Sequence, residues 1–141
     1  MSIARILQGV TEFNQKYSDS YRAALDKIGS PPPPPLAAML TCTDARTLPN
    51  VITRTAPGEL LTLRNVGNIM PPYGGVRGIY SDEAEAAAVE YAIIEKKVAD
   101  IIVCGHSDCA AMRTVFEQCY PPEAPHLRFW LRHAEPALAE L

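Results

Sequence analysis

The sequence lacks the features that mark several classes of protein. Its 13 lysines and arginines are outnumbered by 16 aspartates and glutamates, and no basic run is longer than Lys96-Lys97. Because clustered cations are needed to neutralise phosphates, nucleic acid is not expected as a partner. No apolar run approaches the length of a membrane span, and residues 1–5 lack the pattern of a secretory signal. We therefore predict a cytoplasmic protein with no membrane span.

Cysteine is also scarce, with four residues in the chain: Cys42, Cys104, Cys109 and Cys119. Four are too few for the disulfide framework of a small secreted protein. In a reducing compartment, thiols serve as metal ligands, as nucleophiles or as small core residues. The neighbours of each cysteine must therefore decide its role.

What the sequence does contain is a clear division into segments. Apolar side chains recur at three- and four-residue steps over residues 3–28, which predicts an amphipathic helix. Five consecutive prolines then predict an extended polyproline II connector. We therefore expect an N-terminal helical arm over 1–30, a polyproline spacer over 31–35 and a body over 36–141.

Within the body, predicted strands and helices alternate. Short apolar runs predict buried strands at 36–41, 60–63 and 101–103. Helices are expected from a cap at Ser81 or Asp82 to Lys96-Lys97, from about Cys109 to Tyr120, and over 127–141. Strands that alternate with helices predict an α/β fold, with a parallel sheet and flanking helices.

Polar motifs follow all three predicted strands. They are Cys42-Thr43-Asp44-Ala45-Arg46, Arg64-Asn65-Val66-Gly67-Asn68 and His106-Ser107-Asp108-Cys109. The carboxyl ends of parallel strands lie at one edge of a sheet, where such folds bind ligands. The three motifs are therefore expected to converge.

Two of these motifs contain typical metal ligands. His106 and Cys109 are three residues apart in a strand-to-helix turn, so both side chains can reach one ion, and Cys42 adds a third ligand from another strand end. A set of one imidazole and two thiolates suits zinc, and three protein ligands leave a fourth position for water or substrate. The sequence therefore predicts a catalytic zinc site in the 36–141 domain.

Asp44 and Arg46 are the candidate catalytic residues beside this site. Asp44 is close enough to Cys42 either to bind the metal or to accept a hydrogen bond from the water on it, and these roles exclude each other. Arg46 could hold the carboxylate off the metal through a bidentate pair. Hydroxide generated by zinc near neutral pH and oriented by an aspartate would attack a small electrophilic carbon.

Together, the Cys-x-Asp-x-Arg, Arg-Asn-x-Gly-Asn and Gly-His-Ser-x-Cys elements resemble the β-class carbonic anhydrases, in particular bacterial and cyanobacterial members. The resemblance implies that Cys42, His106 and Cys109 bind Zn²⁺ and that Asp44 and Arg46 govern the water. It also implies reversible hydration of carbon dioxide to bicarbonate. Because the family's chains continue beyond the point that corresponds to Leu141, the 36–141 domain is expected to be incomplete at its C-terminus.

The resemblance has further implications for assembly and location. In the family, N-terminal arms pack on a neighbouring subunit, which implies a homodimer or a larger homo-oligomer. A cyanobacterial-type member could reside in a carboxysome rather than in the open cytoplasm.

Two alternatives to carbonic anhydrase activity remain open at this point. A hydrolase of carbonyl sulfide or carbon disulfide would use the same scaffold. A non-catalytic, zinc-stabilised assembly protein would keep the metal without turnover. Asp44 and Arg46 favour an enzyme, because a structural zinc needs neither residue.

Overall fold

The computed structural model describes residues 3–73 and 83–140. The chain divides into two compact units, Met1–Pro33 and Pro34–Leu141, so the boundary falls among the five prolines. The cap expected at Ser81 or Asp82 lies outside the described residues.

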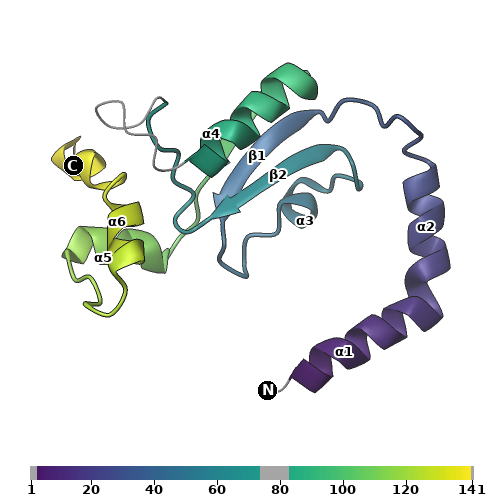
Figure 1. Cartoon of the computed structure of the whole chain (residues 1–141), viewed down its shortest axis with the longest axis horizontal. Helices are drawn as coiled ribbons and strands as arrows, with labels where there is room; N and C mark the ends of the chain where they lie inside the picture. Colours follow the sequence, from purple (N-terminus) through teal and green to yellow (C-terminus); the bar gives the residue numbers. More distant parts are fainter. Residues whose placement is uncertain (1–2, 74–82, 141) are drawn as a thin grey trace. The chain divides into compact units, whose positions relative to one another are not determined.

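The first unit is helical, but it is not one regular α-helix as the periodicity predicts. It consists of α1 (Ile3–Glu12), the π-helical turn η1 (Phe13–Tyr17) and α2 (Ser18–Asp26) (Figure 1). The amide of Ser18 donates to the carbonyl of Phe13, five residues back, so the helix continues through one wide turn. None of the residues in these three elements is buried. Large apolar side chains are exposed along the unit: Ile3, Ile6, Leu7, Val10, Phe13, Tyr17, Tyr21 and Leu25.

The second unit contains a three-stranded parallel sheet, which confirms the predicted α/β fold. Its strands are β1 (Ala37–Cys42), β2 (Leu60–Asn65) and β3 (Ile101–Cys104), in the order β2-β1-β3. Figure 1 shows β1 and β2 side by side, with their arrowheads at the same edge. The strands end in register, since Cys42 lies opposite Asn65 and Thr41 opposite Cys104. The motifs that follow the strands are therefore delivered to one edge.

Burial differs sharply between the strands. All six residues of β1 are buried, because this strand has a neighbour on each side. The prediction that residues 101–103 form a buried strand is wrong, since Ile101, Ile102 and Val103 are 41%, 42% and 54% exposed. The reason is that β3 is an edge strand of the described sheet, and strand order cannot be read from local hydrophobicity.

Helices connect the strands. The short α3 (Pro49–Thr53), which the sequence analysis does not predict, lies between β1 and β2 in the chain. The α-helix α4 (Glu83–Glu90) continues into the π-helical turn η2 (Tyr91–Glu95) before β3. Ala92 of this turn packs with Ala38 of β1 and with Val98 in a small core.

The chain after β3 forms a second core. It contains α5 (Ala110–Glu117), α6 (Pro125–Leu131) and the 3₁₀-helix η3 (Glu135–Glu140). The predicted start of α5 near Cys109 is confirmed, but the helix ends earlier than Tyr120, because Gln118 adopts a left-handed conformation. The single helix expected over 127–141 is instead divided into α6 and η3. Val115 and Leu131 pack against Ile69 in this core.

Candidate metal centre

The three motifs meet at the carboxyl edge of the sheet, as the sequence predicts. Cys42 is the last residue of β1 and Asn65 the last of β2, while His106 follows β3 by two residues. Cys109 is the N-cap residue of α5. The candidate ligands therefore come from the end of β1, the turn after β3 and the start of α5, and these regular elements fix their positions.

Cys42, His106 and Cys109 form a cluster that could hold a metal ion. One candidate ligand atom from each residue lies within 4.8 Å of the others, and the two sulfur atoms are 3.9 Å apart. Both cysteines are buried, with exposures of 5% and 8%. Asp44 is not a member of this cluster.

The imidazole of His106 is oriented as in a metal ligand. Its Nδ1 lies 2.9 Å from the carbonyl oxygen of Ser107. Because a carbonyl only accepts, Nδ1 carries the proton, which leaves the lone pair of Nε2 free in the neutral ring. Nε2 is buried without a hydrogen-bond partner among the described residues. A buried nitrogen left unpaired is costly, so the ring fits a metal ligand better than a core residue.

The surroundings of Cys42 favour the thiolate form that metals require. Burial raises the pKa of Cys42, but the backbone of Asp44, the side chain of His106, the backbone of Gly67 and the thiol of Cys109 stabilise the thiolate and together lower the pKa to about 7. Cys109 is the N-cap residue of α5, so its position is fixed by the start of that helix. The donor set and its environment therefore fit zinc.

Asp44 and Arg46 form a bidentate ion pair beside the cluster. The Nε of Arg46 donates to Oδ1 of Asp44 and its Nη2 to Oδ2, each at 2.9 Å, and the backbone amide of Arg46 also donates to Oδ1 at 2.9 Å. The Arg46 guanidinium holds the pKa of Asp44 well below its usual range. Nη2 also reaches the carbonyl of Asp108 at 3.2 Å. The pair thus fixes the carboxylate and links it to the turn that carries Cys109.

Arg64 and Thr47, for which the sequence predicts no role, brace the loop after β1. The guanidinium of Arg64 donates to the carbonyl of Cys42 from Nε and Nη2, at 3.2 and 3.0 Å, and to the carbonyl of Asp44 at 2.8 Å. The buried hydroxyl of Thr47 lies 2.7 and 2.8 Å from the same two carbonyls. The only sequence signal was the place of Arg64 in the motif expected after a strand at 60–63; the structure extends this strand, β2, to Asn65 and so includes Arg64.

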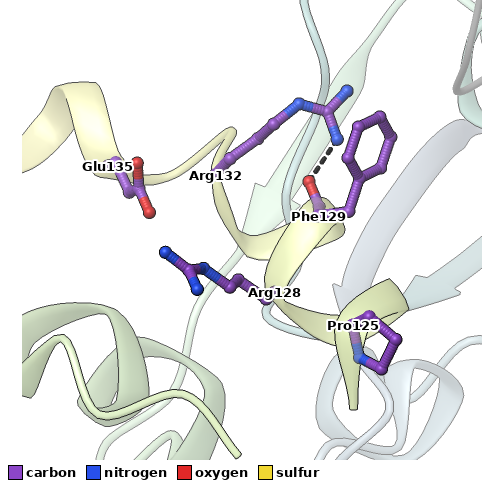
Figure 2. A pocket seen from close by; sticks show the side chains of 5 residues that line it. All are labelled: Pro125, Arg128, Phe129, Arg132 and Glu135. Atoms are coloured by element: carbon purple, nitrogen blue, oxygen red, sulfur yellow. Dashed lines mark hydrogen bonds between the residues drawn. The ribbon is translucent and has the colours of Figure 1, made fainter. Parts of the chain in front are cut away.

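A separate hollow lies on the C-terminal part of this unit. It has a volume of about 340 Å³ and is lined by Pro125, Arg128, Phe129, Arg132 and Glu135. Figure 2 shows the hydrogen bond that the guanidinium of Arg132 donates to the backbone carbonyl of Phe129. None of the predicted site residues lines this hollow, so it does not form part of the metal centre.

Within residues 3–73 and 83–140, no helix has both the length and the apolar character required to cross a bilayer.

Comparison with known proteins places this geometry in a family. The profile of the carbonic anhydrase family matches residues 37–141. A carbonic anhydrase from Pseudomonas aeruginosa is 40% identical over 136 residues, which cover 95% of this chain and 58% of that protein. A carbonic anhydrase from Synechocystis is 36% identical over 132 residues, which cover 93% of this chain and 46% of that protein. The chain thus spans about half the length of these curated relatives.

Solved structures agree with the sequence matches. The β-carbonic anhydrase CcaA superposes with a TM-score of 0.80 at 36% identity, over 95% of this chain and 58% of that one. Tetrameric β-carbonic anhydrases from Sordaria macrospora share the fold, with a TM-score of 0.71 at 23% identity over 92% of this chain and 60% of theirs. Together with the family match over residues 37–141, these findings show that the chain belongs to the β-carbonic anhydrase family.

Proposed function

We propose that this chain forms the zinc site of an enzyme that catalyses the reversible hydration of carbon dioxide to bicarbonate and a proton. The observation that carries the proposal is the Cys42–His106–Cys109 cluster, in which both thiols are buried and Nε2 has no hydrogen-bond partner among the described residues, next to an aspartate fixed by arginine. Zinc held there would supply a Lewis acid that makes water a nucleophile near neutral pH.

The protein side chains would divide the work between binding and control. Cys42 and Cys109 would bind zinc as thiolates, and His106 would bind through Nε2 while Ser107 fixes its ring. Arg46 would hold Asp44 away from the metal, so that the carboxylate can accept a hydrogen bond from the nucleophile and orient it. Arg64 would keep the backbone of Cys42 and Asp44 in place.

The Asp44–Arg46 pair supports an enzyme over a non-catalytic assembly protein. A zinc that only stabilises a fold is closed by protein ligands and has no use for a fixed carboxylate beside it. Carbon dioxide is the preferred substrate because the relatives in the comparisons are carbonic anhydrases. Carbonyl sulfide and carbon disulfide are related electrophiles that the same assay can test.

We also propose a homodimer or larger homo-oligomer in the cytoplasm. The exposed apolar side chains of α1, η1 and α2 support self-association, because a stripe of this kind is normally covered. The Sordaria macrospora proteins are described as tetrameric. The four free cysteines support a reducing compartment, since thiolate ligands must stay reduced.

Stopped-flow measurement of carbon dioxide hydration by the zinc-loaded chain tests the proposed activity. We expect a rate well above that of buffer with the same free zinc, and slow or absent hydrolysis of carbonyl sulfide and carbon disulfide. A folded, zinc-loaded protein with no hydration activity would contradict the proposal. Faster turnover of either sulfur compound would assign the site to the hydrolase alternative.

A further inference from the structure

A side-chain network outside the metal cluster connects α4 to the ligand Cys42. It lies at a hollow of about 250 Å³ lined by residues of β1, β2 and α4, among them Asn65 and Glu85. Glu85 is half-buried in the first turn of α4, whereas Glu83 in the same turn is exposed. The two carboxylates therefore have different environments on one helix.

Asn65 clamps the turn that follows β2. Its Oδ1 accepts from the amide of Ile69 at 2.9 Å, and its Nδ2 donates to the carbonyl of Ile69 at 2.8 Å. Nδ2 also donates to Oε1 of Glu85 at 3.3 Å. A carboxylate only accepts, so Glu85 favours the orientation of the amide in which Nδ2 and Oδ1 both match Ile69.

The clamped turn begins beside Cys42. Asn65 lies opposite Cys42 in the sheet, and its carbonyl accepts a hydrogen bond of 3.0 Å from the amide of Thr43, the residue after Cys42. Gly67 has a φ of +82°, and a Cβ there would lie 2.7 Å from Cε of Met112 on α5. The turn therefore packs closely against α5, the helix that begins after Cys109, and has no room for a side chain at this position.

We propose that Glu85 is a positioning residue for the metal site and acts through Asn65. By holding the Asn65 side-chain amide, it keeps the end of β2 and the 65–69 turn in the conformation that places Asn65 against the end of β1, where Cys42 lies. Glu85 is not among the three clustered ligands, so its effect is on their arrangement and not on the reaction itself. The inference rests on the proposed function, because it assigns a role toward the same zinc.

The competing explanation is that Glu85 only stabilises α4. An acidic residue in the first turn of a helix interacts favourably with the helix dipole, and Glu83 shares that position. Glu83 is therefore the matched control, since it has the same charge on the same turn but is exposed.

Zinc affinity measured by competition with a chelator separates the two explanations. Glu85→Ala removes the acceptor and should weaken zinc binding about 10-fold, the low end for residues that support metal ligands. Glu85→Gln keeps a neutral acceptor and should restore most of the affinity. Glu83→Ala should bind zinc as the unaltered chain does. The melting temperature of the zinc-free proteins reports any effect on α4, and we expect it to be equal in the Glu85→Ala and Glu83→Ala variants.

Cobalt substitution adds a readout that helix stability would not change. The absorption bands of Co²⁺ report ligand geometry, and they should be altered in Glu85→Ala and recovered in Glu85→Gln. Unchanged affinity and spectra in Glu85→Ala, or an equal loss of affinity in Glu83→Ala, would overturn the proposal. Neither readout depends on turnover. An inactive chain with a Glu85-dependent zinc affinity would contradict the proposed activity alone, and an active chain without that dependence would contradict only the role of Glu85.

Discussion

The guanidinium of Arg46 donates a hydrogen bond to each carboxylate oxygen of Asp44, and both hydrogen bonds are 2.9 Å long. The residues are two positions apart, so the pair closes within one loop after β1. A planar fork matched to a carboxylate in this way fixes the direction of the anion as well as its distance.

Arg46→Ala should retain zinc and lose nearly all carbon dioxide hydration. Without the Arg46 guanidinium, the carboxylate of Asp44 is free to bind the metal at the coordination position that the nucleophile needs. We expect a loss of about 100-fold or more, as for removal of a preorganised charge-stabilising group. Metal analysis and stopped-flow kinetics measure the two effects, with the exposed Arg113→Ala as control. Turnover near that of the unaltered chain would show that the pair does not govern the site.

Asp44→Asn should also keep zinc and lose activity, but for the opposite reason. The neutral amide is a poorer metal ligand and accepts a weaker hydrogen bond from the nucleophile. Metal content and hydration rate again provide the measurement. Loss of zinc in this variant would instead identify Asp44 as a ligand.

Cys42→Ser should lower both zinc content and thermal stability. The change removes a soft anionic ligand, and metal binding is coupled to folding. Metal analysis and thermal denaturation with and without a chelator measure the effect. Cys119→Ser is the matched control, because Cys119 is exposed and outside the cluster. Full zinc occupancy after the Cys42 substitution would refute the ligand assignment.

The zinc-free protein should form the Cys42 thiolate with a midpoint near pH 7, since hydrogen bonds lower the pKa to about 7 against burial. The folded pKa is below the unfolded one, so the associated stability is present at high pH and lost as the pH falls through 7. Ultraviolet thiolate absorbance, compared with that of Cys42→Ser, measures the midpoint. A difference signal that titrates only near the ordinary thiol pKa of about 8.5 would contradict this prediction.

Deletion of residues 1–30 should weaken self-association. The apolar side chains of α1, η1 and α2 are exposed within the chain, and removing them removes the surface proposed to bind a second copy. Sedimentation at micromolar concentration should show a smaller species than the full chain forms. Equal masses for the two proteins would mean that the arm is not the interface.

The site residues could be predicted from the sequence because they follow the predicted strands within a few residues. Cys42 and His106 could be assigned to one edge once the strands were taken as parallel. Arg64 could not be assigned its role, since its acceptors are backbone carbonyls about twenty residues away in sequence. The solvent exposure of Ile102 also could not be predicted from the sequence. An apolar strand has the same residue pattern whether it lies at the centre or at the edge of a sheet.

The parallel pairing of β1 with β3 also affects when the metal centre can form. Ala38 pairs with Ile101, so about sixty residues must be closed into a loop before the two strands meet. Contacts between such distant segments form slowly, because the chain loses entropy before it gains the pairing. Cys42 and His106 are adjacent only after this closure, so the nascent or unfolded chain has no preassembled site. The complete three-residue site can therefore form only after this closure, so we expect a signal from tight zinc binding to report that β1 and β3 have paired.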